Sequence, residues 1–370
     1  MEKFQYGHAS NEKWQVAVND CLLQTNPIPP AANFGFIYVT DYFVNELTGI
    51  VAYLKQCTSI DHWVGTVGMS ICASGQEYHD EPAITIMLCD FPEDAFRLFS
   101  TGPTNFESTI DQFRSWFNEN TTPFGIVHGS PTEGQLLEML AKLSTQMGDG
   151  FLVGGLGSSR AGYSHIAADV TQQSLSGVLF SSDISVSTRL TQGCSPQGER
   201  HVITECQQNL IITLDDKPAV DVLKEDIGEV LAKDLGNIGG YIFVGLPIPG
   251  SDTGDYLVRH IIGIDPDVGV LAIGETINAG DSLMFCRRDP QTAYDDLIRM
   301  LNSIKPSISP KGAIYFSCLG RGKAHFGPDS RELKTVQEVL GDIPLVGFFC
   351  NGEISNGRLY GYTGVLTLFL

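Results

Sequence analysis

The sequence predicts an α/β fold of mixed sheets, built from repeated strand-helix-strand-hairpin units and divided into two domains. A strand-helix-strand pattern occurs three times along the chain. Each occurrence is followed by alternating apolar segments, which are typical of antiparallel hairpin strands. The chain has 370 residues, 42% of them hydrophobic, and a single core stops growing at about 250 to 300 residues. Two domains are therefore expected.

The first unit begins at residue 34, after a lead-in formed by residues 1–33. FGFIYVT (34–40) is a continuous apolar run, as expected for a buried strand, and WVGTVGMSIC (63–72) begins the return strand. Between them, apolar side chains recur at helical spacing. These side chains are Leu47, Ile50, Val51 and Leu54. AITIMLCD (83–90) then supplies a hairpin strand.

The second unit occupies residues 124–160. FGIVHGS is its strand, LLEMLAKL its helix and FLVGGLGSS its return strand. The sequence SPTE (130–133) predicts that the helix begins at Ser130, because Ser and Glu three residues apart form a capping box and proline is tolerated in the first turn. The hairpin segment LSGVLFSSDISVSTRL (175–190) follows.

The third unit lies near the C-terminus. GAIYFSCLGRG (312–322) is followed by a predicted helix over residues 330–340, by PLVGFFCNGE (344–353) and by LYGYTGVLTLFL (359–370). Upstream, LDDKPAVDVLKEDIGEVLAK (214–233) reads as a strand end, a turn and a helix. We place the seam there, which gives an N-terminal domain over residues 34–215 and a C-terminal domain over residues 216–370.

Charge and composition narrow the function classes. The chain has 23 Lys plus Arg against 43 Asp plus Glu, a net charge of −20. Without a basic block, nucleic acid and anionic membrane surfaces are not expected partners. The polar start MEKFQYGHAS and the lack of a run of about 18 apolar residues predict a cytoplasmic protein. The nine cysteines occur singly, which indicates reduced thiols and no structural zinc site.

Common phosphate and nucleophile motifs are absent. The glycines at 155 and 157 are not followed by the third glycine and the helix of a dinucleotide fingerprint. Gly322-Lys323 continues with Ala324, where a P-loop needs Ser or Thr. Residues 68–72 and 157–161 each fail the last position of the G-x-S-x-G elbow. These patterns support neither a nucleotide site nor a serine hydrolase.

Cysteine chemistry stays open as an alternative. Cys194, Cys318 and Cys350 each lie in a glycine-flanked turn, and Arg321 and His325 follow Cys318 closely. A nearby cation lowers a thiol pKa and so activates the nucleophile. The competing interpretation is that these thiols pack at strand ends. No pair of histidines has a metal-binding spacing, so no metal site is predicted.

The polar residues at the strand ends form the predicted ligand site. If the units pack together, the glycine-rich strand ends converge. The residues brought together are Ser158, Ser159, Arg160, Cys318, Gly320, Arg321, Cys350, Asn351 and Glu353. An arginine fork suits a carboxylate, whereas Asn and Glu can accept from an ammonium group. The pattern favours an amino-acid-like ligand, although the same residues would also suit solvated turns.

Several segments resemble the FIST family, which combines a FIST N-terminal with a FIST C-terminal domain. They are WVGTVGMSICASGQEYHDEPAITIML, FLVGGLGSSR, LTQGCSPQG, FSCLGRG, PLVGFFCNGEI and LYGYTGVLTLF. The resemblance implies a sensory role in signal transduction, with small ligands such as amino acids as inputs. It also adds Cys194, in the QGCSPQG motif, to the candidate ligand-binding residues. Some members of the family carry haem and sense nitric oxide.

We therefore expect a cytoplasmic sensory protein that binds a small molecule, an amino acid or related carboxylate, and signals through a downstream protein. No catalytic residue and no resident cofactor are predicted. Two alternatives stay open: a thiol-dependent enzyme using Cys194, Cys318 or Cys350, and a haem-binding sensor of nitric oxide.

Overall fold

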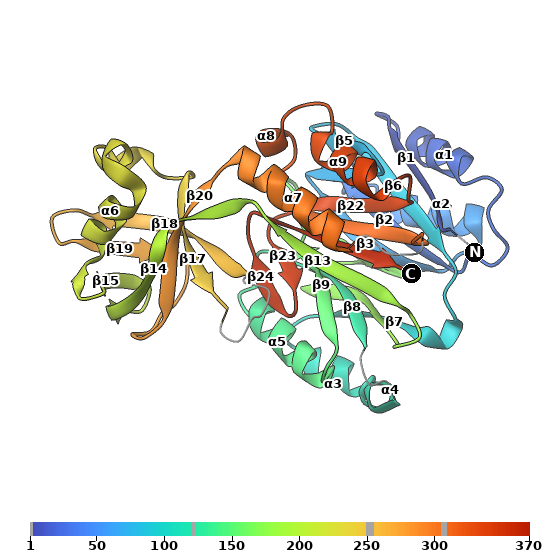
Figure 1. Ribbon diagram of the computed structural model, residues 1–370. Helices are drawn as coiled ribbons and strands as arrows, with labels where there is room; N and C mark the ends of the chain where they lie inside the picture. The colour runs from blue at the N-terminus through green and yellow to red at the C-terminus, as the bar shows by residue number, and fades with distance from the viewer. Residues whose placement is uncertain (1–2, 120–122, 249–254, 305–308) are drawn as a thin grey trace. The chain divides into compact units, whose positions relative to one another are not determined.

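A computed structural model describes residues 3–119, 123–248, 255–304 and 309–370. The chain forms two compact units (Figure 1). The first, here the three-sheet unit, contains Met1–Thr191 and Leu297–Leu370, and the second, the barrel unit, contains Gln192–Asp296. Mixed sheets with helices confirm the predicted α/β class.

The three-sheet unit has three six-stranded mixed sheets, each named here by a central strand. The β2 sheet has the order β1 (Gln5–Ser10), β6 (Ala83–Cys89), β2 (Phe34–Thr40), β3 (His62–Gly68), β10 (His165–Ala167), β11 (Asp169–Thr171). The β8 sheet has the order β24 (Arg358–Tyr360), β23 (Glu353–Ser355), β9 (Phe151–Leu156), β8 (Phe124–Gly129), β12 (Leu175–Phe180), β7 (Phe96–Thr101). The β21 sheet has the order β13 (Val186–Gln192), β25 (Thr363–Phe369), β21 (Gly312–Cys318), β22 (Leu345–Cys350), β4 (Ser70–Ala73), β5 (Gln76–His79).

The three sheets exchange hairpins. Each sheet is centred on one parallel pair, β2 with β3, β8 with β9 or β21 with β22. The hairpin that follows a parallel pair in the chain joins a different sheet: β4 and β5 extend β22, β10 and β11 extend β3, and β23 and β24 extend β9. Each sheet is thus completed by residues from another part of the chain, which ties the three together.

The helices follow the apolar spacing of the sequence. In the three-sheet unit they are α1 (Trp14–Gln24), α2 (Leu47–Thr58), α3 (Phe106–Asp111), α4 (Arg114–Glu119), α5 (Leu136–Gln146), α8 (Lys323–Phe326) and α9 (Arg331–Leu340), with the 3-10 turns η1 (Asp41–Phe43) and η2 (Glu93–Ala95). α7 (Pro290–Ile304) contains the division between the units. The predicted start of the second helix at Ser130 is wrong: α5 begins at Leu136, because the Ser130 hydroxyl bonds Thr132 rather than a helix N–H.

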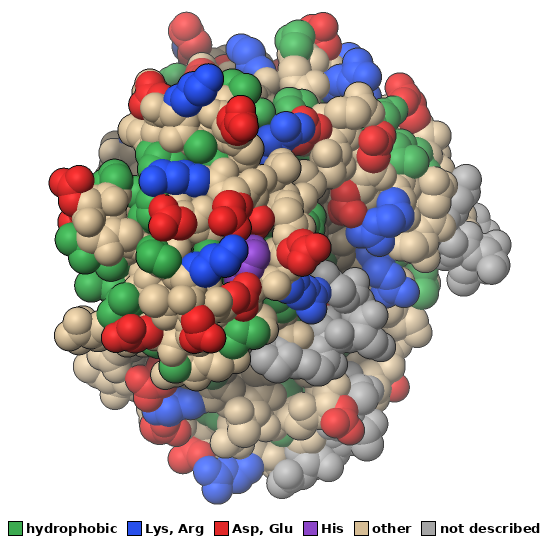
Figure 2. Space-filling model, turned by 60° about the vertical axis from the view of Figure 1, so that its left-hand side comes forward, with side chains coloured by type: hydrophobic (Ala, Val, Ile, Leu, Met, Phe, Trp, Pro, Cys, Tyr) green, Lys and Arg blue, Asp and Glu red, His purple; other side chains and the backbone are tan. Residues whose placement is uncertain are grey.

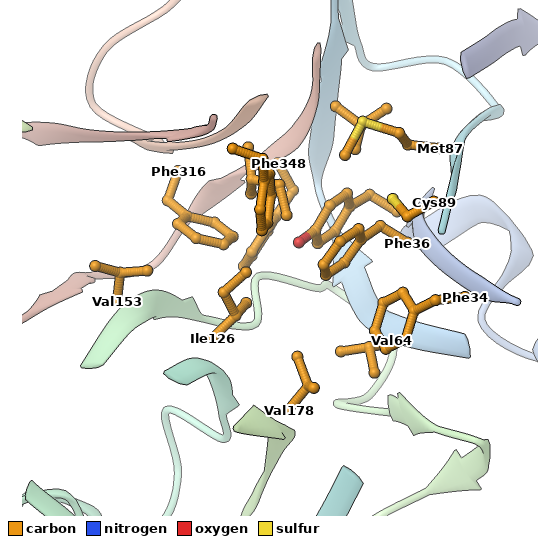
Figure 3. Packing of buried hydrophobic residues seen from close by; sticks show 14 of the residues in the cluster. Phe34, Phe36, Val64, Met87, Cys89, Ile126, Val153, Val178, Phe316 and Phe348 are labelled. Carbon is orange, nitrogen blue, oxygen red and sulfur yellow. The ribbon is translucent and has the colours of Figure 1, made fainter. Parts of the chain in front are cut away.

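Aromatic side chains from all three sheets build one shared core. Phe36 and Val64 come from the β2 sheet, Ile126 from the β8 sheet, and Phe316 and Phe348 from the β21 sheet (Figure 3). All five are fully buried. Each large apolar side chain contributes roughly 1.5 to 3 kcal/mol when buried. This core holds the strand ends of the three sheets in fixed positions.

The barrel unit is a closed antiparallel sheet. Six strands pair in a cycle, and β16 (Lys217–Pro218) lies outside it. The cycle is β14 (Cys194–Gln207), β20 (Ser282–Arg288), β17 (Ile242–Pro247), β18 (Tyr256–Asp265), β19 (Val270–Ile273) and β15 (Leu210–Leu214), which pairs with β14. α6 (Ala219–Ala232) buries its apolar side chains in the barrel core, and η3 (Leu235–Asn237) follows it. Closure leaves no unpaired edge in the cycle.

The two compact units are not separated by a single boundary in the sequence. The predicted seam after residue 215 lies between β15 and β16, inside the barrel unit. The compact units divide after Thr191 and after Asp296, because the three-sheet unit is assembled from two segments of the chain. Within the described ranges, no helix is long and apolar enough to cross a membrane.

Candidate functional site

The ends of the three return strands meet at Ser158. Its hydroxyl donates to the carbonyl of Phe349, at 2.6 Å, and accepts from the backbone N–H of Met69, at 2.9 Å. Met69 follows β3, Ser158 follows β9, and Phe349 belongs to β22. Ser158 is buried. One hydroxyl group therefore fixes the relative positions of three strand ends.

The exit of β22 packs directly against β9. The backbone N–H of Asn351 donates to the carbonyl of Leu156, at 3.0 Å. Gly155 faces Cys350 so closely that a Cβ atom at this position would lie 2.1 Å from the thiol sulfur. Glu353 is the register partner of Gly155. The glycine of the motif therefore permits a close approach that places Cys350 and Glu353 beside β9.

Arg321 and Glu332 form a fully buried ion pair. The Arg321 Nε donates to Oε1 of Glu332 at 2.8 Å, and both side chains are 0% exposed. The same carboxylate accepts from the Tyr315 hydroxyl at 2.7 Å, from the Ser317 hydroxyl at 3.0 Å and from the Gly322 N–H at 2.9 Å. Burial lowers the pKa of Arg321, but the negative charge of Glu332 outweighs it and the net pKa is raised. The guanidinium therefore stays charged.

The outer edge of this guanidinium, Nη1 and Nη2, has no hydrogen-bond partner among the residues that the structure describes. Nη1 and Nη2 of Arg321 are buried and form no hydrogen bond within the described part of the chain. The ring of Phe326 lies 4.8 Å from the guanidinium carbon, so one face is covered by an aromatic side chain. Buried donors without a partner are rare in folded proteins. This edge is the strongest candidate for a ligand contact.

Glu353 is the second buried group with an open atom. Its Oε2 accepts from the N–H of Thr363 at 3.1 Å and from the Thr363 hydroxyl at 2.7 Å, whereas Oε1 has no partner among the described residues. Burial raises the pKa of Glu353 to about 8, against the opposing effects of Thr363, Arg321 and a hydrogen bond from the Cys318 thiol. Arg321 therefore acts on Glu353 electrostatically, while its direct partner is Glu332.

Arg160 differs from Arg321 because its fork is already occupied. Its Nε donates to Oδ2 of Asp41 at 2.9 Å and its Nη2 to Oδ1 at 2.7 Å. The Arg160 backbone N–H also donates to Asp41, and the guanidinium lies over the ring of Tyr42 at 5.3 Å. The side chain is 46% exposed. This bidentate pair fastens the loop after β9 to η1. Nη1 donates to Oδ1 of Asp80 at 3.4 Å, so all three guanidinium nitrogens already have carboxylate partners.

Ser159 and Gly320 hold turns. The Ser159 hydroxyl accepts from the N–H groups of Ala161 and Gly162, both at 3.1 Å. A Cβ atom on Gly320 would lie 2.9 Å from the ring of Tyr362. Asn351 is exposed. The ligand-binding role predicted for these three residues stays a prediction, and the structure gives the first two a local function.

Two of the three candidate thiols share one environment, because Cys318 and Cys350 are register partners on β21 and β22. Cys350 is fully buried and Cys318 partly buried, and burial together with the nearby Glu353 carboxyl raises the pKa of both. A raised pKa disfavours the reactive thiolate. Cys194 begins β14 in the barrel unit, where its carbonyl accepts from the Tyr256 hydroxyl at 2.6 Å. The backbone groups of Gly320 and Tyr362 and the charge of Arg321 lower the pKa of Cys318, but burial and Glu353 outweigh them, so the net pKa is raised.

Glu332 is the site residue that sequence reasoning missed. An acidic residue in the first turn of a helix normally reads as a solvated group that favours the helix dipole. Tyr315 and Ser317 were assigned only to an apolar strand, although they alternate toward one face of β21 and could have indicated a polar partner there. Among the described residues, no group of three or more His, Cys, Asp or Glu side chains could hold a metal ion.

Comparison with known proteins identifies the family. The FIST N domain model matches residues 33–217, and the FIST C domain model matches residues 219–356. The chain belongs to the FIST family. FIST domains serve in sensing and signal transduction. The boundary between the two matches falls inside the barrel unit, so each FIST match includes part of both compact units.

Mycobacterial proteins are among the relatives. The uncharacterized protein Rv0628c of Mycobacterium tuberculosis is 29% identical over 348 residues, which cover 90% of this chain and 88% of the relative. The uncharacterized protein Mb0898c of Mycobacterium bovis is 27% identical over 324 residues, covering 83% of this chain and 82% of the relative. The similarity therefore extends through both FIST domains.

Proposed function

We propose that this protein is a cytoplasmic sensory protein that binds a small carboxylate, such as an amino acid, at the outer edge of Arg321. The observation that carries the proposal is that the buried Nη1 and Nη2 of Arg321 have no hydrogen-bond partner in the described part of the chain. Two parallel N–H donors match the two oxygens of a carboxylate. A ligand at this edge would satisfy both donors and would remove the free-energy penalty of leaving them unpaired.

Glu353 offers a second contact point, which favours a ligand with more than one polar group. Its Oε1 is open and its neighbourhood is electrostatically linked to Arg321. A second ligand group that donates a hydrogen bond, such as an ammonium, would meet Oε1, and its positive charge would lower the raised pKa of Glu353 and favour the ionised form. An amino acid carries both groups. The ligand would thus join the loop after β21 to β23, which belong to different sheets.

The signal is proposed to pass to a downstream protein rather than to nucleic acid. On the face shown in Figure 2, Lys and Arg side chains are interspersed with Asp and Glu. Together with the net charge of −20, such a surface does not attract a polyanion. A protein partner that recognises one ligation state would complete the sensor.

A thermal-shift screen of the purified protein against amino acids and small carboxylates tests the proposal. A ligand present at about 100 times its Kd adds roughly 2.7 kcal/mol to the free energy of unfolding, so a true ligand raises the melting temperature visibly. If no compound raises it, the proposal is wrong.

The arginine contact is tested with the double variant Arg321→Met, Glu332→Gln, which removes both buried charges together and leaves neither unpaired. We expect the double variant to melt cooperatively and to lose the ligand-induced shift. Arg114→Ala is the control, since Arg114 is an exposed surface residue and its variant should keep the full shift. A shift that survives in the double variant would place the ligand elsewhere.

A further inference from the structure

A serine, a histidine and a glutamate form a hydrogen-bonded chain in the hairpin of β4 and β5. Ser70 and His79 are register partners across the hairpin, and Glu77 lies two residues before His79, on the same face of β5. We propose that Ser70 is an acyl-accepting nucleophile, with His79 as its general base and Glu77 as the carboxylate that orients the imidazole. The substrate class is a small carboxylic ester.

The distances match a nucleophile relay. The Ser70 hydroxyl lies 2.9 Å from Nδ1 of His79, and Nε2 of His79 lies 2.7 Å from Oε2 of Glu77. A carboxylate accepts hydrogen bonds, so Nε2 carries the ring proton and Nδ1 presents its lone pair to Ser70. In serine proteases Nε2 faces the serine. The two ring nitrogens are exchanged here, but each performs the same acid-base step.

The carboxylate and the imidazole are held from several sides. Oε1 of Glu77 accepts from the N–H of Leu333 at 3.2 Å, and the Glu77 N–H donates to the Ser330 hydroxyl at 2.9 Å. The Glu77 side chain is 1% exposed. Phe349 packs against the His79 ring with 4.8 Å between centroids. A catalytic base needs this kind of fixed orientation.

Access limits the substrate to small acyl groups. Ser70 is 7% exposed, and the His79 side chain is 19% exposed. The imidazole therefore reaches solvent, and the more deeply buried serine hydroxyl lies 2.9 Å from Nδ1 of the ring. A short, uncharged ester can approach such a hydroxyl, whereas a long chain or a polypeptide cannot.

The reaction balances with the ester and water alone. Ser70 Oγ forms a bond to the acyl carbon while its proton moves to Nδ1 of His79, and the alcohol leaves with that proton as the C–O bond breaks. Water then attacks the acyl carbon and gives one proton to His79. The bond between Ser70 Oγ and the acyl carbon breaks, His79 returns this proton to Oγ, and the carboxylic acid is released. The ionised Glu77 stabilises the imidazolium during both steps.

This relay escapes a motif search because it is built on a hairpin rather than on a strand-to-helix elbow. Residues 68–72 fail the elbow pattern, yet the strand register places His79 opposite Ser70. The inference is independent of the proposed sensor site, because it uses none of the residues assigned to ligand binding there.

Labelling of the full-length protein with a fluorophosphonate probe tests the proposal. Attack by Ser70 forms a P–O bond and expels fluoride, and mass spectrometry locates the adduct. We expect modification at Ser70, no modification there in Ser70→Ala, and labelling slower by about 100-fold or more in His79→Gln. Glu77→Gln should slow labelling less severely. Turnover of p-nitrophenyl acetate should follow the same order.

Ser74→Ala is the matched control. Ser74 follows β4 in the same hairpin, but its hydroxyl bonds the carbonyl of Ile343, so labelling at Ser70 should be unchanged. Melting temperatures of all variants identify any that fail to fold, and labelling rates are compared only among folded variants. Absence of an adduct at Ser70 in the native protein, or equal rates in His79→Gln and the native protein, would overturn the proposal.

Discussion

The interiors of the two units differ in the groups that they bury. The barrel core consists of apolar side chains, and among the described residues of that unit the one buried polar side chain is Gln192, its first residue. The three-sheet unit buries many polar groups. Those with charged or imidazole side chains are Asp41, Glu77, His128, His165, Arg321, His325, Glu332 and Glu353.

This difference separates a stabilising interior from a functional one. Burying a charge is unfavourable unless it is paired and hydrogen-bonded, so a chain selected for stability alone fills its core with apolar groups. The barrel follows that rule. The three-sheet unit departs from it at Arg321, Glu332 and Glu353, and departures of this kind concentrate at functional sites. We therefore predict how a change in the charge or the protonation state of such groups affects stability.

The largest expected effect is that of Glu332→Gln. This change leaves the buried Arg321 guanidinium without its counter-charge, and breaking a buried pair on one side destabilises a protein by about 3 to 5 kcal/mol. Urea denaturation measures the loss. Glu338→Gln, an exposed position on the same helix, is the control and should stay within about 0.5 kcal/mol of the native protein. Equal effects at the two positions would show that Arg321 does not depend on Glu332.

An intermediate effect is expected at Glu353, where the free energy of unfolding should depend on pH. Because the folded pKa, about 8, lies above the ordinary value of 4.5, the folded state holds the proton more tightly than the unfolded state. The contribution of Glu353 to stability is therefore complete below pH 4.5 and falls as the pH rises to about 8, by up to about 1.4 kcal/mol per unit. Glu353→Gln should remove this fall in urea midpoints measured between pH 5 and 9. If the urea midpoints of the native protein and of Glu353→Gln change in parallel with pH, the prediction is wrong.

The smallest effect on stability is expected at His201, on the surface of the barrel unit. His201 lies 2.7 Å from Asp215 and 3.0 Å from Asp226. Partial burial lowers the pKa of His201, but these two carboxylates outweigh burial and raise it above the ordinary 6.5. The stabilisation is present below pH 6.5 and is lost as the pH rises through the folded pKa.

His201→Gln should accordingly reduce stability by about 1 kcal/mol at pH 6, because Asp215 is half exposed and solvent screens the pair, and should have little effect at pH 9. Melting temperatures at the two pH values measure the difference. A loss that is larger at pH 9 would reverse the sign and would show that burial, rather than the carboxylates, dominates at His201.

The sequence predicted individual strands and helices better than it predicted which strands pair with one another. The apolar run at residues 34–40 and the helical spacing from Leu47 to Leu54 became β2 and α2, because strand and helix formation follow local periodicity. WVGTVGMSIC (63–72) was predicted to begin one return strand, but it divides into β3 and β4, and β4 pairs in another sheet. Strand pairing joins segments far apart in the sequence, and their local patterns do not specify which edge they complete.

For the candidate site, too, the sequence indicated the residues but not their partners. Sequence singled out both Arg160 and Arg321, each at the end of a glycine-rich segment. It did not distinguish them, since the difference lies in which carboxylate each one meets. Asp41 accepts from Nε and Nη2 of Arg160 and Asp80 accepts from Nη1, whereas Glu332 accepts only from Nε of Arg321, and Nη1 and Nη2 of Arg321 have no hydrogen-bond partner among the described residues. Asp41 directly follows the strand at residues 34–40 and Glu332 lies in the predicted helix over residues 330–340, and no local pattern indicates which arginine either acid meets.

The sequence by itself determined the α/β class, the strands and helices of the repeated segments, and membership of the FIST family, because periodicity and motif residues are properties of short segments. Only the tertiary structure decided which sheet receives each hairpin, that residues 192–296 form a closed barrel, and which buried arginine keeps two free donors. Those outcomes depend on contacts between distant segments, and the free energy of such contacts exists only once the chain has folded.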